Sequence, residues 1–307
     1  MAVNHERLVA RCELAPGTKF RPQDFDPADQ LVPEFARMRG ATLKKRAREL
    51  LEQSRTELGV SQELLWASDE FAVLVVFQGM DTAGKDGLVT HVMSGVNPSA
   101  CEVHAFKQPS AEELNHNFLW RYWQRVPGRG RIGIFNRSYY EEVLVVRVHP
   151  ELLGRRRPHP GAPGKKLWQQ RYDDINNFER HLSRNGTLVL KFFLNLSKEE
   201  QKRRLLARLE DKAKRWKFST GDLKERSYWD EYTEAYQSML SATSTKWAPW
   251  YVIPADHKHV ARAVVASILS ERIDALGLSY PTISSAEARA QGDARRLLSR
   301  PAKRTRE

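Results

Sequence analysis

The stretch "FQGMDTAGKDGL" (Phe77–Leu88) directly follows the apolar run "FAVLVV". Within it, Gly79, Gly84 and Lys85 satisfy the pattern G-x-x-x-x-G-K of a phosphate-binding P-loop. A strand, a glycine-rich turn and a helix start stand in the required order, so backbone N–H groups and the helix N-terminus can surround a phosphate. The pattern predicts an α/β fold built around this loop, in which Lys85 neutralises the phosphoryl group that is transferred.

Two carboxylates stand in this anion-binding loop and need an explanation, because bare carboxylates repel phosphate. Asp81 lies at the crest of the loop, and Asp86 occupies the position where a Ser or Thr usually helps to hold Mg²⁺. Magnesium would explain both acids, since it bridges carboxylate and phosphate oxygens. For Asp86 the alternative is an acid in the first helical turn that favours the helix dipole. We therefore expect Asp81 to be the metal ligand and leave Asp86 open between the two roles.

The rest of the chain repeats the order of strand and helix. Short apolar runs rich in Val, Ile and Phe predict strands at 71–77, 101–106, 131–135, 187–194 and 249–254. Helical patterns lie before and between them, at 41–68 as one helix or two, 85–95, 110–125, 165–184, 198–213, 227–243 and 258–275. Apolar strands that alternate with helices indicate a parallel sheet covered on both faces. The expected fold is a three-layer α/β/α sandwich of about five parallel strands.

This α/β domain is expected to extend over residues 41–282. Residues 1–40, which are mixed in composition and punctuated by proline, are interpreted as an irregular N-terminal arm. Residues 283–307 contain "RRLLSRPAKRTRE" and are expected to form a basic, disordered tail. No run approaches the roughly 18 apolar residues that cross a bilayer, and no secretory signal is evident. With two cysteines and no zinc spacing, we expect a cytoplasmic protein without a membrane partner.

The net charge of +12 indicates polyanionic partners: nucleic acid, an acidic membrane or a phosphate-rich substrate. Hydrophobic residues at 41% and charged residues at 29% are typical of a globular protein. The tail accounts for part of the charge, but Lys and Arg also cluster at 155–166 ("RRRPHPGAPGKK") and 210–217 ("EDKAKRWK"). The first of these clusters is predicted to be a loop. Its basic rim would favour a polyanion with many phosphates.

Basic side chains after the fourth predicted strand are expected to cover the phosphate site. Arg204 and Arg208 lie four residues apart on one helix face, and Arg215 and Lys217 follow toward its end. A mobile basic lid over about 204–226 would stabilise charge on the phosphoryl oxygens and exclude water. The alternative is a solvated charged helix. Lys191 lies inside an apolar strand, where its ammonium needs a partner, either a phosphate in the pocket or a carboxylate.

Four motifs in order resemble the polyphosphate kinase 2 family: "GMDTAGKDG" at 79–87, "FNRSYYEEVLVVRVHPELL" at 135–153, "KFFLNLSKEEQKRRLLARLEDKAKRWKFSTGDLKER" at 191–226 and "APWYVIPADHK" at 248–258. The resemblance implies a P-loop kinase fold similar to thymidylate kinase, with a helical lid. It implies phosphoryl transfer between inorganic polyphosphate and the nucleotides AMP, ADP and ATP, with Mg²⁺ or, as an alternative ion, Mn²⁺. It also implies a homo-oligomer, either a homodimer or a homotetramer.

The sequence departs from the commoner pattern of this family after the third predicted strand. Many members have an aspartate there, in D-R-S-W-Y-N-R, that serves as the Walker B acid, whereas this chain has Asn136. An amide offers Mg²⁺ no full negative charge, so the metal site must depend on Asp81 together with Glu141 or Glu142. The form N-R-S-x-Y-E resembles the class III subgroup, which phosphorylates both AMP and ADP.

The expected reaction is a direct, in-line transfer, because no activated nucleophile is evident and such transfers mainly need positioning and charge neutralisation. Lys85 and Arg137 are expected to hold the phosphoryl group, Arg137 through a bidentate contact, while Arg208 closes from the lid. Arg121 is expected either to contact a nucleotide phosphate or to pack on its aromatic neighbours. The catalytic candidates are Lys85, Asp81, Arg137, Asn136, Glu142 and Arg208. The binding candidates are Gly79, Gly84, Lys85, Asp86, Arg121, Lys191, Arg204, Arg215 and Lys217.

Two other functions remain open at this point. The same fold permits an ATP-dependent nucleoside monophosphate kinase, and the long basic surface is the feature that distinguishes the two enzymes. A P-loop protein that binds nucleic acid would also use the positive charge. The sequence contains no recognisable nucleic-acid module, so we do not expect nucleic acid as a partner.

Overall fold

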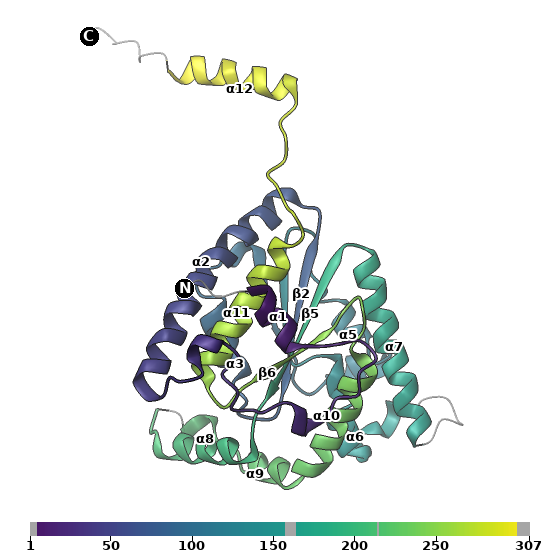
Figure 1. Ribbon diagram of the computed structural model, residues 1–307. Coiled ribbons are helices and arrows are strands. Elements are labelled where there is room, and N and C mark those ends of the chain that lie inside the picture. Colours follow the sequence, from purple (N-terminus) through teal and green to yellow (C-terminus); the bar gives the residue numbers. More distant parts are fainter. Residues whose placement is uncertain (1–4, 157–163, 214, 300–307) are drawn as a thin grey trace, which may run out of the picture.

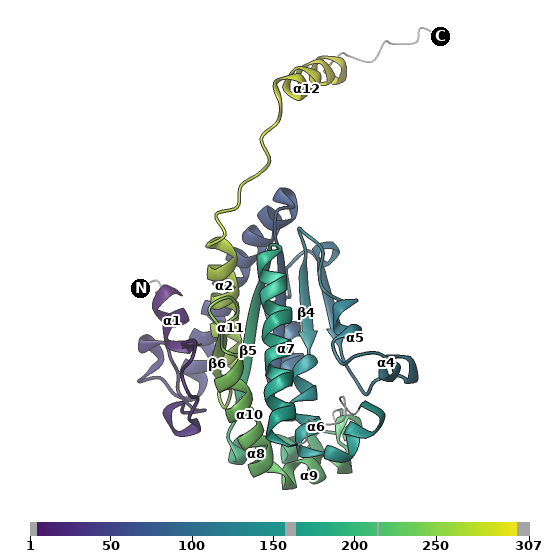
Figure 2. The same ribbon diagram turned by 90° about the vertical axis from the view of Figure 1, so that its right-hand side faces the viewer.

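The computed structural model describes residues 5–156, 164–213 and 215–299. Within these residues the chain forms one sheet of six strands in the order β1-β6-β5-β2-β4-β3, with helices on both faces (Figures 1 and 2). Strands β2 to β6 pair in parallel, and β1 pairs with β6 in the antiparallel sense. The predicted three-layer α/β/α fold with a parallel sheet is therefore confirmed.

The five parallel strands lie within two residues of the predicted runs. The strands are β1 (Glu13–Leu14), β2 (Ala72–Gly79), β3 (Cys101–Ala105), β4 (Ile132–Asn136), β5 (Thr187–Asn195) and β6 (Trp250–Pro254). Strand β2 is buried along its whole length at the centre of the sheet. Its side chains alternate between two cores: Val73 and Val75 contribute to one, and Leu74 and Val76 to the other. This burial on both faces explains why the predicted strand is apolar at every position.

Most predicted helices are also present in the described residues. The α-helices are α1 (His5–Cys12), α2 (Gly40–Ser68), α3 (Lys85–Val92), α4 (Ala111–Asn115), α5 (Trp120–Trp123), α6 (Val145–Val148), α7 (Lys165–Arg184), α8 (Lys198–Glu210), α9 (Thr220–Ser227), α10 (Trp229–Thr243), α11 (Lys258–Asp274) and α12 (Ser285–Leu298). Short 3₁₀ helices are η1 (Pro22–Asp24), η2 (Pro33–Phe35), η3 (Pro98–Ala100), η4 (Tyr139–Glu142), η5 (Pro150–Arg156) and η6 (Arg215–Lys217). The first predicted helix runs unbroken through Gly59, and the one predicted at 110–125 is two short helices. In the described part of the chain, no helix has both the length and the apolar character needed to span a bilayer.

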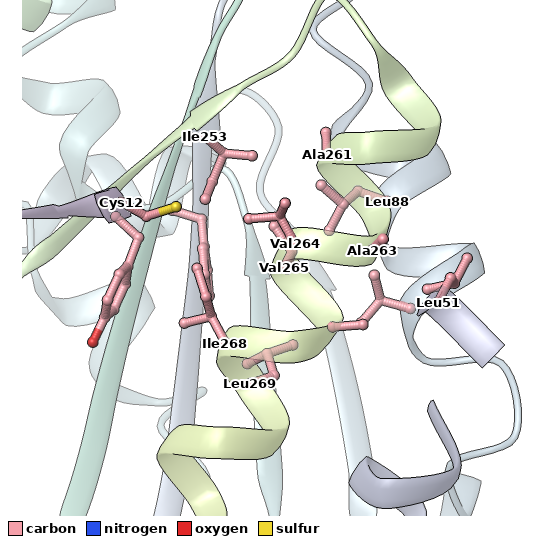
Figure 3. Packing of buried hydrophobic residues seen from close by; sticks show 14 of the residues in the cluster. Cys12, Leu51, Leu88, Ile253, Ala261, Ala263, Val264, Val265, Ile268 and Leu269 are labelled. Atoms are coloured by element: carbon pink, nitrogen blue, oxygen red, sulfur yellow. The ribbon is translucent and has the colours of Figure 1, made fainter. Parts of the chain in front are cut away.

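Helices α2 and α11 cover one face of the sheet and pack against each other. The close-up in Figure 3 shows Val264, Val265 and Ile268 of α11 in this core, together with Leu51 of α2 and Ile253 of β6. Helices α7 and α10 cover the opposite face, beside β5 and β6 (Figures 1 and 2). Because both faces are closed by apolar packing, functional polar groups can gather only at the edges of the sheet.

The N-terminal segment is part of the domain, and its interpretation as an irregular arm is corrected. Helix α1 packs on α11, and β1 adds to the sheet through Leu14, which pairs in register with Trp250. Phe20 and Phe35 are almost fully buried. The asparagine side chain at the end of β5, Asn195, donates to the carbonyl oxygen of Phe25 (2.8 Å). The prolines that made this segment look irregular instead begin its two 3₁₀ helices.

The C-terminal segment is helical over Ser285–Leu298, so the expectation of a fully disordered tail is corrected. A capping box explains where α12 begins: the side chains of Ser284 and Glu287 each accept from the other's backbone N–H. Figure 1 shows α12 separated from the domain by an extended stretch. Every side chain of α12 is exposed, so α12 adds nothing to the core. Residues 300–307 lie outside the described residues.

Candidate active site

The P-loop connects β2 at the centre of the sheet to α3, in the order that the sequence predicted. At Gly79 a Cβ atom would lie 2.9 Å from the carbonyl oxygen of Leu194 on β5, so only glycine fits between the two strands. Gly84 has a φ of 105° and begins α3. Thr82 also has a positive φ, 64°, which is uncommon for a residue with a side chain. The strand edge and these turns bend the loop around the N-terminus of α3, as phosphate binding requires.

The ammonium of Lys85 lies against the inner side of this loop. Its Nζ atom donates to the carbonyl oxygens of Gly79 (2.6 Å) and Met80 (3.2 Å). Burial lowers the pKa of Lys85 below its ordinary value, and the positive charge of Arg137 lowers it further, against the opposing effect of Asp81. These partners leave the ammonium at the wall of the cleft described below. The placement agrees with the predicted phosphate-binding role.

Arg137 follows β4 and lies between two carboxylates. Its guanidinium forms ion pairs with Asp81 (2.9 Å) and Glu141 (3.2 Å). The negative charge of Glu141 is the main reason that the pKa of Arg137 is raised. The backbone of Arg137 has a φ of 65°, and its N–H donates to the carbonyl oxygen of Phe77 (3.3 Å). This strained conformation turns the side chain toward the P-loop, and such strain is common at functional sites.

The two residues that departed from the usual patterns contact each other. The amide nitrogen Nδ2 of Asn136 donates to Oδ1 of Asp86, at a distance of 2.6 Å. Asp86 stands at the position of the usual Ser or Thr, and Asn136 stands at the position of the Walker B acid. In the usual arrangement the neutral group follows the P-loop lysine and the acid follows the strand. Here the acid and the neutral group are exchanged between the two positions, and they contact each other. This contact explains why an acid is tolerated at the start of α3, in addition to the helix dipole.

Glu141 and Glu142 have different surroundings, which the sequence left undecided. Glu141 lies beside Asp81 through their shared partner Arg137. Glu142 is 4% exposed and pairs with the buried Arg171 at 3.4 Å. Both glutamates line the cleft described below, so the prediction that Glu142 acts in catalysis or metal binding stays a prediction. Among the described residues, no group of three or more His, Cys, Asp and Glu side chains forms a ready-made metal site.

Helix α8 supports the P-loop, so the predicted lid does not begin at Arg204. The guanidinium Nη1 of Arg204 donates to the carbonyl oxygens of Thr82 and Ala83, both at 3.0 Å. Gln201 donates to the carbonyl oxygen of Asp81 (3.0 Å). Arg204 therefore holds the backbone of the loop; it also lines the cleft described below, and its role as a binding residue stays a prediction. These bonds satisfy carbonyl groups of the loop that no strand or helix pairs.

The remaining residues of the predicted lid differ in whether they line the cleft. Arg208 lines the cleft and forms an ion pair with Asp222 of α9 at 3.0 Å. Arg215 donates through Nε to the carbonyl oxygen of Leu209 (2.6 Å) and is not among the cleft-lining residues, so its assignment to the site is corrected. The side chain of Lys217 lies outside the described part of the structure. Most of the predicted basic loop at 155–166 does so as well.

Lys191 has no access to a ligand, and its assignment as a binding residue is wrong. Its side chain is fully buried and its Nζ atom lies 2.7 Å from Oε2 of Glu179. It also donates to the hydroxyl of Tyr140 (2.9 Å) and to the carbonyl oxygen of Thr243 (2.7 Å), at the end of α10. Of the two partners that the sequence allowed, the structure has the carboxylate. Lys191 is a core residue between β5 and the helices that cover it.

A cleft of about 1290 Å³ runs along the carboxyl edge of the sheet, with the P-loop at its middle. On the β5 and β6 side it is lined by basic residues from α8 and α11: Arg203, Arg204, Arg208, Lys258 and Arg262. On the β4 and β3 side it is lined mainly by apolar groups, among them Phe106, Pro109, Leu114, Tyr122, Val146 and Leu152. The order of strands places β2 between these two groups. The basic residues therefore form one end of the cleft and the apolar residues form the other, with the P-loop between them. We call these the basic end and the apolar end.

Arg121 lies in the wall of the apolar end. Its Nε atom is 3.2 Å from Oε1 of Glu113, and its guanidinium carbon lies 5.3 Å from the ring centre of Phe106. Both alternatives from the sequence therefore remain compatible with its position, because it packs on an aromatic ring and also borders the cleft. The ion pair with Glu113 holds the side chain in this place.

Sequence reasoning missed several residues around the site. Gln78 is fully buried in β2, and with its amide nitrogen facing Glu141 it donates to Oε1 of that residue at 3.0 Å. Its signal was an amide inside an apolar strand. Lys258 and Arg262 line the basic end, and their signal was an i,i+4 pair of cations directly after a strand end. Gln201 gave no signal on a helix rich in polar residues.

Comparisons with known proteins show which family the chain resembles. A family model described as Polyphosphate kinase 2 (PPK2) matches residues 42–278. The chain is 52% identical over 244 residues to a protein of Rhodopseudomonas palustris named ADP-polyphosphate phosphotransferase, with 79% of this chain and 84% of that protein covered. It is 43% identical over 273 residues to a protein of Meiothermus ruber named AMP/ADP-polyphosphate phosphotransferase, with 89% of this chain and 96% of that protein covered.

Solved structures give the same result. The crystal structure of polyphosphate kinase 2 from Arthrobacter aurescens TC1 is similar with a TM-score of 0.81 at 37% identity. The similarity covers 94% of this chain and 96% of that chain. A putative polyphosphate kinase 2 from Pseudomonas aeruginosa has a TM-score of 0.67 at 31% identity, over 75% of this chain and 47% of that chain.

Proposed function

Because the chain belongs to the polyphosphate kinase 2 family, we propose that it transfers a phosphoryl group from inorganic polyphosphate to AMP and to ADP, and catalyses the reverse transfer. The observation that carries this proposal is the cleft with a P-loop between a basic and an apolar end. A polyphosphate chain consists only of charged phosphates, which the basic end attracts. A nucleoside has a flat apolar base, which the apolar end can bury.

The reaction needs little beyond positioning and charge neutralisation. A phosphate oxygen of AMP or ADP attacks the terminal phosphorus of polyphosphate. The bond from that phosphorus to its bridging oxygen breaks, so the chain loses one phosphate and the nucleotide gains it. Lys85 at the P-loop and Arg137 after β4 neutralise the charge on the transferred group, and Arg208 approaches from α8. This assignment requires no covalent enzyme intermediate.

We further propose that Mg²⁺, with Mn²⁺ as an alternative ion, is bound by Asp81 and Glu141. Magnesium is usually held by one or two carboxylates together with substrate phosphates. The residues fit this rule, because these two carboxylates share Arg137 as a partner and border the same cleft. The ion would neutralise charge that develops on the phosphate oxygens. Asp86 is a further carboxylate at the same wall, oriented by Asn136.

The finer parts of the proposal rest on sequence motifs and relatives. The relative from Meiothermus ruber is named for both AMP and ADP, and the motif N-R-S-x-Y-E of this chain favours the same dual use. We propose a homodimer or homotetramer on the family resemblance. We also propose a cytoplasmic location, because AMP, ADP and ATP are the nucleotides that it would act on.

The experiment that tests the function compares donors. Purified protein is incubated with Mg²⁺ and AMP or ADP, together with either polyphosphate or ATP, and the nucleotides are separated by chromatography. We expect ADP from AMP, and ATP from ADP, when polyphosphate is the donor. Product that forms only with ATP would overturn the proposal and identify a nucleoside monophosphate kinase instead. Omission of Mg²⁺, with chelator present, tests the metal proposal in the same assay.

A further inference from the structure

Four cations on two packed helices extend beyond the basic end of the cleft. Lys44 and Arg48 are exposed on α2, and Lys258 and Arg262 lie on the first turns of α11. Helices α2 and α11 pack along each other (Figures 1 and 3). Only Lys258 and Arg262 line the cleft. Lys44 and Arg48 therefore continue the positive surface out of the cleft; we call the four residues the α2–α11 basic track.

Contacts with neighbouring elements fix the place of the track. Arg262 reaches toward α3, where its Nη2 lies 3.1 Å from the position that a Cβ at Gly87 would take. Gly87 lies in the first turn of α3, next to the phosphate cradle. On α2, Leu43 and Ala47 are buried in the core that α11 completes, and the two cations of that helix are their direct neighbours in sequence. The track therefore begins at the P-loop helix and crosses to α2.

Three of the four cations of this track have no acidic partner in the described part of the chain. Among the residues that the structure describes, Lys44, Arg48 and Arg262 form no ion pair with an acidic side chain. Burial and the positive charges of Arg204 and Arg48 lower the pKa of Arg262. Both helices carry like charges at i,i+4 spacing, which disfavours each helix. Such an arrangement is unfavourable unless an anion binds to it.

We infer that the α2–α11 basic track binds the distal phosphates of a polyphosphate chain whose terminal phosphates occupy the cleft. This inference rests on the proposed function and adds to it a preference for chain length. Short chains end inside the cleft and gain nothing from α2, whereas longer chains reach Lys44 and Arg48. The added contacts act as a second site joined to the first, so they raise the affinity for long chains without touching the reacting atoms.

The test uses two double variants of the full-length protein with the same change in charge. Lys44→Glu with Arg48→Glu inverts the outer part of the track. Arg184→Glu with Lys246→Glu is the control, because these exposed residues lie before β5 and β6, at the opposite end of the sheet from the cleft. Binding of long-chain polyphosphate and of tripolyphosphate is titrated without nucleotide, and KM is measured for both donors. Thermal unfolding confirms that both variants fold.

For the track variant we expect the Kd and KM for long-chain polyphosphate to rise about tenfold or more, with little change for tripolyphosphate and in the control. The slope of log Kd against log salt should fall by about two in the track variant, as it does when phosphate contacts are lost from a nucleic-acid-binding protein. Unchanged binding of the long chain would overturn the inference, as would an equal loss for both donors. Because binding is measured without nucleotide, absence of polyphosphate-dependent turnover in the wild type would refute the proposed function separately.

Discussion

Two lysines next to the central strand, one partly buried and one fully buried, show how differently this chain treats a cation. Lys85 is the first residue of α3, after the P-loop that follows β2, and Lys191 is paired in register with Val76 of β2. Burial lowers the pKa of both ammonium groups. Lys191 is closed in by Glu179, Tyr140 and Thr243, and no part of it reaches the cleft. The partners of Lys85 are two backbone carbonyls, and it borders the cleft.

The difference teaches that partners, and not burial alone, separate a structural cation from one that acts on a ligand. A buried carboxylate neutralises Lys191 permanently, because both charges would be costly alone. Carbonyl oxygens supply partial charges only, so the field of Lys85 remains available to a phosphate. Arg137 is intermediate, since its carboxylate partners Asp81 and Glu141 are themselves partly exposed at the cleft. Replacement of Lys85 should therefore affect mainly activity, and replacement of Lys191 should affect mainly stability.

The largest effect is expected for Lys85→Ala. Loss of the ammonium should lower kcat/KM for polyphosphate-dependent transfer on the order of 10³-fold, because charge on the transferred group would be left uncompensated. The free energy of unfolding should change by less than about 1 kcal/mol, since only two hydrogen bonds to carbonyls are lost. Initial rates and denaturant titrations measure the two quantities. Full activity in this variant would remove the P-loop assignment.

Lys191→Met should give the opposite pattern. It leaves Glu179 buried without its cation, which should lower the free energy of unfolding by about 3–5 kcal/mol. The double variant Lys191→Met with Glu179→Gln should recover much of this loss, because no unpaired charge remains. Any folded fraction should keep its KM values, since Lys191 is outside the cleft. A stable single variant with a raised KM for nucleotide would restore Lys191 as a binding residue.

The same two lysines show which parts of the fold and the site could be predicted from the sequence. The P-loop was predictable because a local pattern of glycines, strand and helix specifies both the backbone and the position of Lys85. The strands were predictable because burial on both faces leaves continuous apolar runs. The role of Lys191 was not predictable, because its partner Glu179 lies on the preceding helix α7, and only the packing of α7 on β5 brings the two together. A buried lysine in a strand signals a partner without identifying it.

Partners distant in sequence also determine the roles of the two glutamates after β4, of Arg204 and of the N-terminal segment. Glu141 and Glu142 are neighbours in one 3₁₀ helix, but Glu141 pairs with Arg137 after β4 and Glu142 with Arg171 of α7. Arg204 shares a helix face with Arg208 in sequence, but its partners are P-loop carbonyls that no helical pattern reveals. The N-terminal segment was read as irregular because its turns begin with proline, while its burial depends on β6. Local sequence patterns thus predict the helices and strands, whereas the role of a side chain depends on partners that are distant in sequence.

Asn136→Asp tests whether the exchanged pair with Asp86 needs one neutral member. Two carboxylates 2.6 Å apart cannot both ionise easily, so the pKa of one should rise above its unfolded value. The stability of the variant relative to wild type should then be kept at low pH and fall by roughly 1–2 kcal/mol as pH rises through the raised pKa. We expect an altered Mg²⁺ requirement or AMP to ADP ratio, with folding retained.

The control for this prediction is the double variant Asp86→Asn with Asn136→Asp, which exchanges acid and amide. It should restore the stability at neutral pH, because one carboxylate and one amide again face each other. Denaturant titrations at pH 5 and pH 8 provide the comparison. A single variant with the same stability as wild type at both values would show that the contact has no electrostatic role.

The smallest expected effect concerns His259, which lies beside the basic track. The pKa of His259 is lowered to about 4, mainly by burial and then by the positive charges of Arg262 and Lys258. Lys44 and Arg48 on the facing helix act in the same direction. The folded-state pKa lies below the unfolded value of 6.5, so the stability that neutral His259 provides is complete above pH 6.5 and is lost as pH falls toward 4.

Bound polyphosphate should reverse this shift, because it brings negative charge to the cations around His259. The pKa of His259 should rise in the complex, so a proton is taken up on binding, and the affinity for long chains should increase as pH falls from 6.5 to 5. We expect less than about a threefold increase, since water screens this half-exposed ring. NMR titration of the histidine signals with and without polyphosphate measures the pKa, and His259→Asn should remove this part of the pH dependence. A pKa that stays near 4 in the complex would show that the polyphosphate chain does not pass over the α2–α11 basic track. The cations of the track would then differ from Lys85, because they would have no phosphate to bind.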